Sequence, residues 1–247
     1  MSTQIAPRTV IETLVPLRGE TGLRSVYDAA NAVGIADQPL RLAIRRMITA
    51  GELEQHGRGR TGSLTLTRSG RIRLDRDQLA LNLAAAQDDG EVRWDGAWRL
   101  IAISAPERLR ALRDGLRRDL LAAGAAKIST GLYLSPHDLT GLLDESARAH
   151  LVTAEARSLD LRGLDDPRDI GEQLWPAAAI IRRYDDVARA VEADDLTWPV
   201  AVRRIRLADA LERAMRDDPL LPPELRAKPW PPTRHRLAWR ARWSQTH

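Results

Sequence analysis

The feature that most constrains the fold is a pair of short helical patterns joined by a tight turn, close to the start of the chain. Apolar side chains recur at helical spacing over residues 23–34 and again over residues 38–50. Gly34 ends the first pattern and Gly51 ends the second, because glycine accepts the left-handed backbone that closes a helix. Two helices joined by so short a connection form a helix-turn-helix, with residues 34–37 as its turn.

A hairpin is predicted directly after the second helix. Residues 53–56 and 63–67 have the composition of short strands, and they flank a segment rich in glycine and arginine, residues 57–62. The glycines permit the positive φ angles of a hairpin tip. With a further helix expected over residues 8–15, these elements predict an N-terminal winged helix-turn-helix domain over residues 1–75. A linker helix is expected over residues 76–91, and it ends at Gly90.

The second helix separates apolar from basic side chains. At about 100° per residue, Leu40, Ile44, Met47 and Ile48 fall on one face, where we expect them to contact a core. Asp37 or Gln38 is expected to cap the start of this helix. The side chains expected to project from this helix and the hairpin and to contact DNA are Gln38, Arg41, Leu42, Arg45, Arg46, Thr49, His56, Arg58 and Arg60.

Charge is concentrated in the same region. The whole chain carries a formal net charge of +4, whereas residues 41–73 alone hold eight arginines against two glutamates, a net +6. A genome-wide preference for arginine does not explain a surplus confined to one segment. Positive charge on one helix and one hairpin is typical of a surface that binds duplex DNA. The alternative is a solvated face of an interaction module that does not touch DNA.

The middle of the chain alternates strand and helix signals. Its order predicts a compact ferredoxin-like α+β domain over residues 92–165. The elements expected there are a strand at 98–104, a helix at 106–123, a strand at 131–136, a helix at 137–149 and a strand at 150–157. From Pro167 to Pro219 the pattern is helical, and prolines interrupt it afterwards. The fold class is therefore α+β, with a helical C-terminal domain over residues 166–247.

Several functional classes find no support in the residues. The chain has no cysteine, so disulfides and thiolate metal sites are excluded. No apolar run is long enough to span a bilayer and the N-terminus lacks a secretion-signal pattern, which favours a cytoplasmic protein without membrane contact. The five histidines show no metal-binding spacing, and no catalytic motif is present. We therefore expect no enzyme activity, no metal and no cofactor.

The order of the middle elements resembles the CRISPR-associated ferredoxin-like endoribonucleases. Those enzymes place a metal-binding aspartate at the end of their first strand, where this chain has Ser104. Asp95 lies before the strand and does not take that position. Without a carboxylate there, metal-assisted phosphodiester cleavage lacks its ligand, so the resemblance extends to the fold and not to nuclease activity.

Several motifs along the chain occur in a characteristic order and spacing. These are residues 40–53 with residues 66–71, Trp94-Asp-Gly-Ala-Trp98, Gly131-Leu-Tyr-Leu-Ser-Pro136, Leu174-Trp-Pro with Tyr184 downstream, and the proline-rich segment from Asp218 to Pro231. Taken together, they make nearly the whole chain similar to the PaaX family, repressors of phenylacetic acid degradation operons.

The resemblance implies a dimeric transcriptional repressor that an aryl-CoA thioester, such as phenylacetyl-CoA, releases from its double-stranded DNA operator. An aryl group favours contacts with indole and phenol rings, and the CoA phosphates need cations nearby. The candidate effector-binding residues are Trp98, Tyr133, Trp175, Arg182, Arg183 and Tyr184. The alternatives are a winged-helix interaction module and an acyl-CoA-handling enzyme, neither of which binds DNA specifically.

Overall fold

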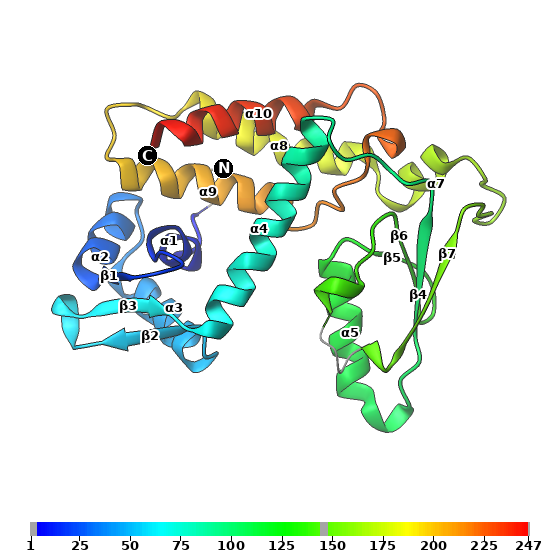
Figure 1. The fold of residues 1–247 in the computed structure, drawn as a ribbon. Coiled ribbons are helices and arrows are strands. Elements are labelled where there is room, and N and C mark those ends of the chain that lie inside the picture. The colour runs from blue at the N-terminus through cyan, green and yellow to red at the C-terminus, as the bar shows by residue number, and fades with distance from the viewer. Residues whose placement is uncertain (1–3, 144–147, 247) are drawn as a thin grey trace. The chain divides into compact units, whose positions relative to one another are not determined.

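The computed structural model describes residues 4–143 and 148–246 (Figure 1). It confirms the predicted α+β class, with two antiparallel sheets and many helices. The residues group into two compact units that are discontinuous in sequence. The first unit comprises Met1–Leu81, Asp185–Arg213 and His235–His247, and the second comprises Asn82–Tyr184 and Ala214–Arg234. Segments of the predicted C-terminal range thus contribute to both units, and the predicted domain ranges stay predictions.

The first unit begins with helices and short strands in alternation. The sheet has the order β1-β3-β2, and both pairings are antiparallel. β1 pairs with β3 in three residues and was not predicted. The elements are α1 (Pro7–Leu14), β1 (Glu20–Gly22), α2 (Leu23–Ala32), α3 (Asp37–Thr49), β2 (Leu53–His56), η1 (Gly59–Thr61) and β3 (Ser63–Leu66).

One apolar core holds these elements together. From α3 it receives Leu40, Ile44 and Met47, which are at most 3% exposed. Val10 and Ile11 of α1, Val26 and Ala30 of α2, Leu53 of β2 and Leu64 of β3 belong to the same cluster. Ile48 was expected in this core, but it is 36% exposed, because it lies at the edge of the apolar stripe.

The ends of α2 and α3 explain the turn between them. Gly34 and Gly51 both have positive φ, +86° and +71°, as the sequence predicts for residues that close helices. The predicted capping of α3 is wrong. Ala36 is the N-cap residue, with no side-chain cap, and Asp37 is already inside the helix. Its carboxylate is instead bound by Asn31 and Arg60.

α4 (Arg68–Asp88) follows β3 almost at once, so it starts at Arg68 rather than at residue 76. Gly70 in its first turn allows a close approach to the residue that precedes β2, since a Cβ there would lie 2.1 Å from the carbonyl oxygen of Glu52. Arg73 pairs with Glu12 of α1 and with Glu52, and Arg8 also pairs with Glu52. These contacts fix the beginning of α4 to the base of the hairpin.

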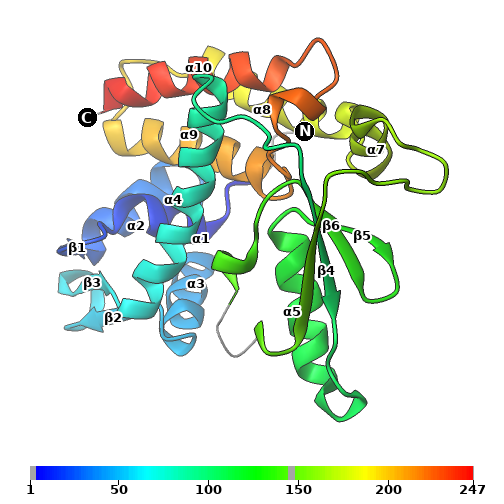
Figure 2. The ribbon, with the colours of Figure 1, turned by 45° about the vertical axis from the view of Figure 1, so that its right-hand side comes forward.

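The second unit contains a four-stranded antiparallel sheet of order β5-β6-β4-β7. α5 (Arg110–Ala122) lies along this sheet (Figures 1 and 2), and its Leu120 joins a core with Ile101 and Tyr133. The strands are β4 (Trp98–Ile103), β5 (Ala126–Ser129), β6 (Leu132–Ser135) and β7 (Leu151–Ala156). Three of them were predicted, and β5 was missed because it is short and follows α5 without a polar turn.

The helix predicted over residues 137–149 is wrong at its start. Residues 137–143 contain the 3-10 turn η3 (Thr140–Leu142), and residues 144–147 lie outside the described residues. The helical C-terminal region is present as α7 (Pro167–Leu174), α8 (Ala177–Glu192) and α9 (Val200–Met215). α10 (Pro231–Trp243) was not predicted, because prolines, which usually interrupt a helix, occupy its first turn, where a helix tolerates them. The remaining 3-10 turns are η2 (Glu107–Leu109), η4 (Pro223–Leu225) and η5 (Ser244–Thr246).

Candidate nucleic-acid interface

The outer face of α3 is polar and basic. All six of the predicted DNA-contacting side chains on this helix are exposed, and even Leu42 is 44% exposed. Their orientation follows from the apolar residues on the other side, which anchor the helix in the core. The exposed six are Gln38, Arg41, Leu42, Arg45, Arg46 and Thr49.

Four predicted cations of this surface are not neutralised by an acid. Among the described residues, Arg41, Arg45, Arg46 and Arg58 have no carboxylate within ion-pair distance. An unpaired exposed guanidinium has all its N–H donors available to a phosphate or to a guanine edge. This leaves the face of α3 and the tip of the hairpin with a local excess of positive charge.

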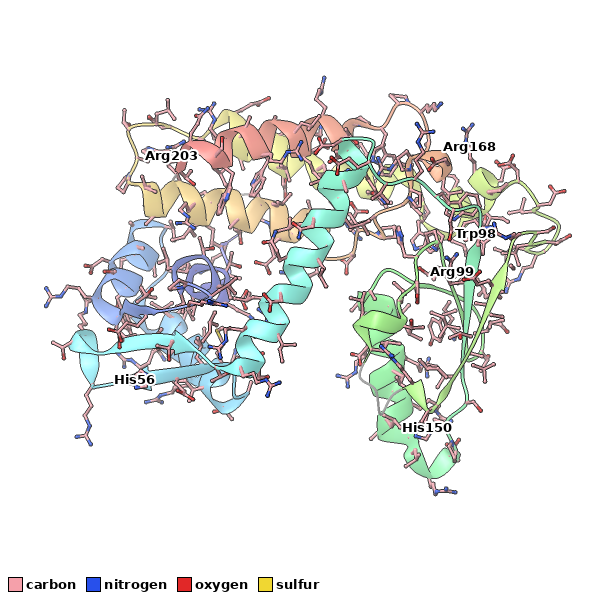
Figure 3. All side chains as sticks on the ribbon, in the orientation of Figure 1. His56, Trp98, Arg99, His150, Arg168 and Arg203 are labelled. Carbon is pink, nitrogen blue, oxygen red and sulfur yellow. The ribbon has the colours of Figure 1, made fainter. Side chains whose placement is uncertain are left out.

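The hairpin holds its tip in a compact shape. His56 pairs with Ser63 at the last step of the ladder, and Gly57 has φ +75°. At Gly62 a Cβ would lie 2.6 Å from the carbonyl oxygen of His56, so this position needs glycine. His56 itself is exposed on β2, with its Nε2 3.3 Å from the Thr65 hydroxyl (Figure 3). Arg58 is exposed at the tip.

Arg60 differs from the other predicted cations. Its Nη1 lies 3.2 Å from Asp28 of α2, and its Nη2 lies 3.2 Å from Asp37 of α3. Its guanidinium also stands over the Tyr27 ring, 5.5 Å from the centroid. The hydrogen bond from Asn31, together with that from Arg60, lowers the pKa of Asp37 below its usual value. Arg60 thus joins the hairpin tip to both helices of the predicted helix-turn-helix.

A cavity of about 310 Å³ lies between these elements. It opens at the junction of α2, α3 and the hairpin, and both charge signs line it. The lining residues are Leu23, Tyr27, Asp37, Arg41, Ile44, Arg45, Gln55, Gly59 and Arg60. The cavity therefore brings two unpaired arginines of α3 beside the Arg60–Asp37 pair.

Sequence reasoning missed Tyr27, Asp28 and Asp37 as parts of this surface. Asp28 and Asp37 lie nine residues apart, and only the folded turn between α2 and α3 places both beside the hairpin tip. The separation of Asp37 and Arg60 along the sequence does not indicate that the two side chains pair. The sequence signal that could have identified this pair is Asp37 itself, an acid in the first turn of the basic helix α3, and the sequence predicts this residue only as a helix cap.

A comparison with known protein families gives a match within the second unit. Residues 91–169 match the model described as the PaaX protein central Cas2-like domain. Over these residues the chain is similar to the PaaX central domain. Over residues 91–169, which include β4, α5, β5, β6 and β7, this match confirms the resemblance predicted from the sequence.

A solved structure is similar to this chain over nearly its whole length. It is an uncharacterized protein, Rv0674, from Mycobacterium tuberculosis, with 21% identity and a TM-score of 0.59. The alignment covers 99% of this chain and 96% of that one, so the two share a fold. Among curated proteins, none matches this sequence.

The aromatic residues predicted for effector binding are packed inside the second unit. Trp98 and Trp175 are stacked with their centroids 6.3 Å apart, and Trp94 contacts Trp98 at 5.2 Å. Trp98 is 1% exposed and Tyr133 is fully buried (Figure 3 labels Trp98 on β4). The Trp175 indole N–H donates to the carbonyl oxygen of Gly124 at 3.0 Å.

The other predicted effector residues lie on α8. The Tyr184 hydroxyl donates to Asp218 Oδ2 at 2.6 Å, inside the unit. Arg183 donates to the carbonyl oxygen of Asp217 at 2.8 Å, whereas Arg182 is exposed. The structure thus brings Trp98 and Trp175 together and gives Tyr184 and Arg183 partners of their own. Their role toward an aryl-CoA stays a prediction.

Catalytic and metal chemistry were not expected at the end of β4. The Ser104 amide donates to the carbonyl oxygen of His150 at 2.8 Å, which extends the pairing of β4 with β7. In the part of the chain that the structure describes, no three His, Asp or Glu side chains gather as a metal site would require.

Over the described residues, no helix is both long and apolar enough to cross a membrane.

Proposed function

We propose that this protein is a transcriptional regulator that binds duplex DNA through α3 and the β2–β3 hairpin. The PaaX central domain supports a regulator of the PaaX family. The order α1-β1-α2-α3-β2-β3 is the order of a winged helix-turn-helix, in which α3 is the recognition helix and the hairpin is the wing.

The observation that carries the proposal is the two-sided character of α3. Leu40, Ile44 and Met47 are buried, while three arginines on the opposite side, Arg41, Arg45 and Arg46, are exposed and unpaired among the described residues. A B-DNA major groove about 12 Å wide admits a helix about 10–12 Å across. Arginines on its outer face can then reach guanine edges or phosphates.

The finer parts of the proposal follow from the family resemblance. We infer a cytoplasmic homodimeric repressor of an aromatic-acid catabolic operon, released from its operator by an aryl-CoA thioester such as phenylacetyl-CoA. A two-fold dimer requires half-sites about 34 Å apart, or a multiple of that distance. An effector can shift such an equilibrium only by its difference in affinity for the free and the DNA-bound states.

The test is a gel-shift titration with promoter DNA from upstream of the protein's own gene, at controlled salt, with and without phenylacetyl-CoA. Arg45→Ala is expected to weaken specific binding by about 1–3 kcal/mol if the side chain contacts a base. Arg110→Ala is the matched control, because it removes the same charge from an exposed helix of the second unit.

The outcomes separate the proposals. Weakening of the Arg45 variant on its promoter but not on unrelated duplex assigns base contact, and equal weakening on both assigns phosphate contact. Loss of the complex with phenylacetyl-CoA supports effector release. Absence of DNA binding at any moderate salt would instead favour the interaction module or the acyl-CoA-handling enzyme.

A further inference from the structure

We propose that Asp28 and Asp37 compete with the DNA backbone for Arg60, and that these two carboxylates thereby limit the affinity of the protein for duplex DNA. The inference rests on the proposed function, since it concerns the same surface. It adds two acidic residues, one on α2 and one on α3, to the set that determines binding.

The geometry of Arg60 is the first step. The side chain starts from η1 at the hairpin tip, where a wing would approach DNA, yet it turns back toward the helices. Its two Nη atoms each lie 3.2 Å from a carboxylate oxygen, one of Asp28 and one of Asp37. In this position its donors are used within the protein, whereas Arg58, two residues earlier, has no acid within ion-pair distance among the described residues.

The second step is the exposure of these groups. The side chain of Arg60 is 48% exposed, and those of Asp28 and Asp37 are 59% and 40% exposed. Ion pairs this open to water are weak, so a phosphate can replace a carboxylate as the partner of the guanidinium. Burial does not lock the contact, and the exchange needs only a rotation of one long side chain.

The third step is the position of Asp37. It lies in the first turn of α3, where the helix dipole favours a negative charge. Asn31 donates to its Oδ1 at 3.2 Å, which leaves Oδ2 for Arg60. Phosphates often bind at helix N-termini, so Asp37 supplies its own anion where a DNA phosphate would otherwise sit.

The cavity beside this pair adds a further reason. Arg41 and Arg45 line it together with Asp37 and Arg60. A phosphate entering there meets two unpaired cations and one carboxylate, so the carboxylate opposes its entry. Removing the negative charge would leave three arginines facing one small volume, which is a strong site for a phosphate diester.

The experiment measures binding of the full chain to a fluorescent duplex of about 20 base pairs without operator sequence, at about 100 mM salt and at several higher salt concentrations. The double variant Asp28→Asn with Asp37→Asn is expected to bind roughly three- to tenfold tighter than the wild type, with a steeper salt dependence. Asp28→Asn alone, which leaves the Asn31–Asp37 contact intact, is expected to give a smaller gain of the same sign.

Two comparisons test the mechanism. Glu107→Gln with Asp114→Asn is the matched control, because it removes two exposed, arginine-paired acids from the second unit. This control is expected to change the affinity for the duplex by less than the Asp28 and Asp37 double variant does. The second comparison repeats the Asp28 and Asp37 substitutions in an Arg60→Ala background, where the gain is expected to be several-fold smaller.

Three results would overturn the inference. The Asp28 and Asp37 variant could bind no tighter than the control, or it could bind more weakly, which would show that the contact positions the wing for DNA. Equal gains with and without Arg60 would show that the acids act by repulsion alone. In each case the wild type still binds DNA, so the proposed function would stand. A wild type without DNA binding would refute both.

Discussion

Which face of α3 is buried can be tested by the same Leu→Ala substitution at two positions of this helix. Leu40 is fully buried in the core of the first unit, and Leu42, two residues later, is 44% exposed on the outer face. Leu→Ala removes three carbon groups, worth about 2.4 kcal/mol of transfer free energy at about 0.8 kcal/mol per group, and a buried site adds a cavity term. We therefore expect Leu40→Ala to lower the free energy of unfolding by about 3–4 kcal/mol, and Leu42→Ala by less than about 0.5 kcal/mol.

The assay is hydrogen exchange of the amides in α1, α2 and α3. The chain has two compact units, so a single denaturation curve does not isolate the stability of one of them. Faster exchange is expected for the Leu40 variant only, whereas Leu42→Ala is expected to weaken DNA binding without changing exchange. Equal losses of protection in the two variants would refute the assignment of α3 faces, and with it the claim that its arginines are directed outward.

Two further predictions concern residues whose surroundings are unusual. Burial lowers the pKa of His137, against the effect of its hydrogen bonds to Leu220 and Pro219. Because the folded pKa lies below the unfolded one, stability is fully present above about pH 6.5 and is lost as pH falls toward the folded pKa. His137→Gln is expected to flatten this part of a plot of unfolding free energy against pH, and an unchanged slope would contradict the reasoning. Gly70→Ala is expected to destabilise the first unit by about 1–3 kcal/mol, because a Cβ would lie 2.1 Å from the Glu52 oxygen. Gly22→Ala, with nothing within 4 Å of the added Cβ, is its control, and hydrogen exchange of amides in the first unit is the measurement. Equal protection in the two variants would show that α4 yields without strain.

The sequence predicted elements well where one periodicity dominates. α2, α3, β4 and α5 were placed nearly correctly, since their apolar residues follow a clear helical or strand period. β5 and α10 were missed for different reasons. β5 has four residues and leaves no room for a periodic pattern, and the prolines that start α10 also signal interruption elsewhere in the chain.

The candidate site was predicted in part. The exposed residues of α3 follow directly from its helical period, so their orientation needed no tertiary information. The partners of Arg60 could not be predicted, because Asp28 and Asp37 reach it only through the turn between α2 and α3 and through the hairpin. A residue's charge is visible in a sequence, but whether that charge is compensated depends on contacts between segments far apart in the chain.

That distinction changes what the cluster of arginines means. Of the eight arginines between residues 41 and 73, Arg60 is paired with two aspartates and Arg73 with two glutamates. Arg71 donates to the carbonyl oxygen of Leu66 at 2.7 Å, at the start of α4. Arg60 and Arg73 are paired with carboxylates of the protein itself, so the net charge counted along the sequence overstates the charge offered to a partner. The cations left for the proposed DNA contact are the three arginines of α3, Arg58 at the hairpin tip and Arg68 at the start of α4. Binding that depended equally on Arg73 would contradict this division of roles.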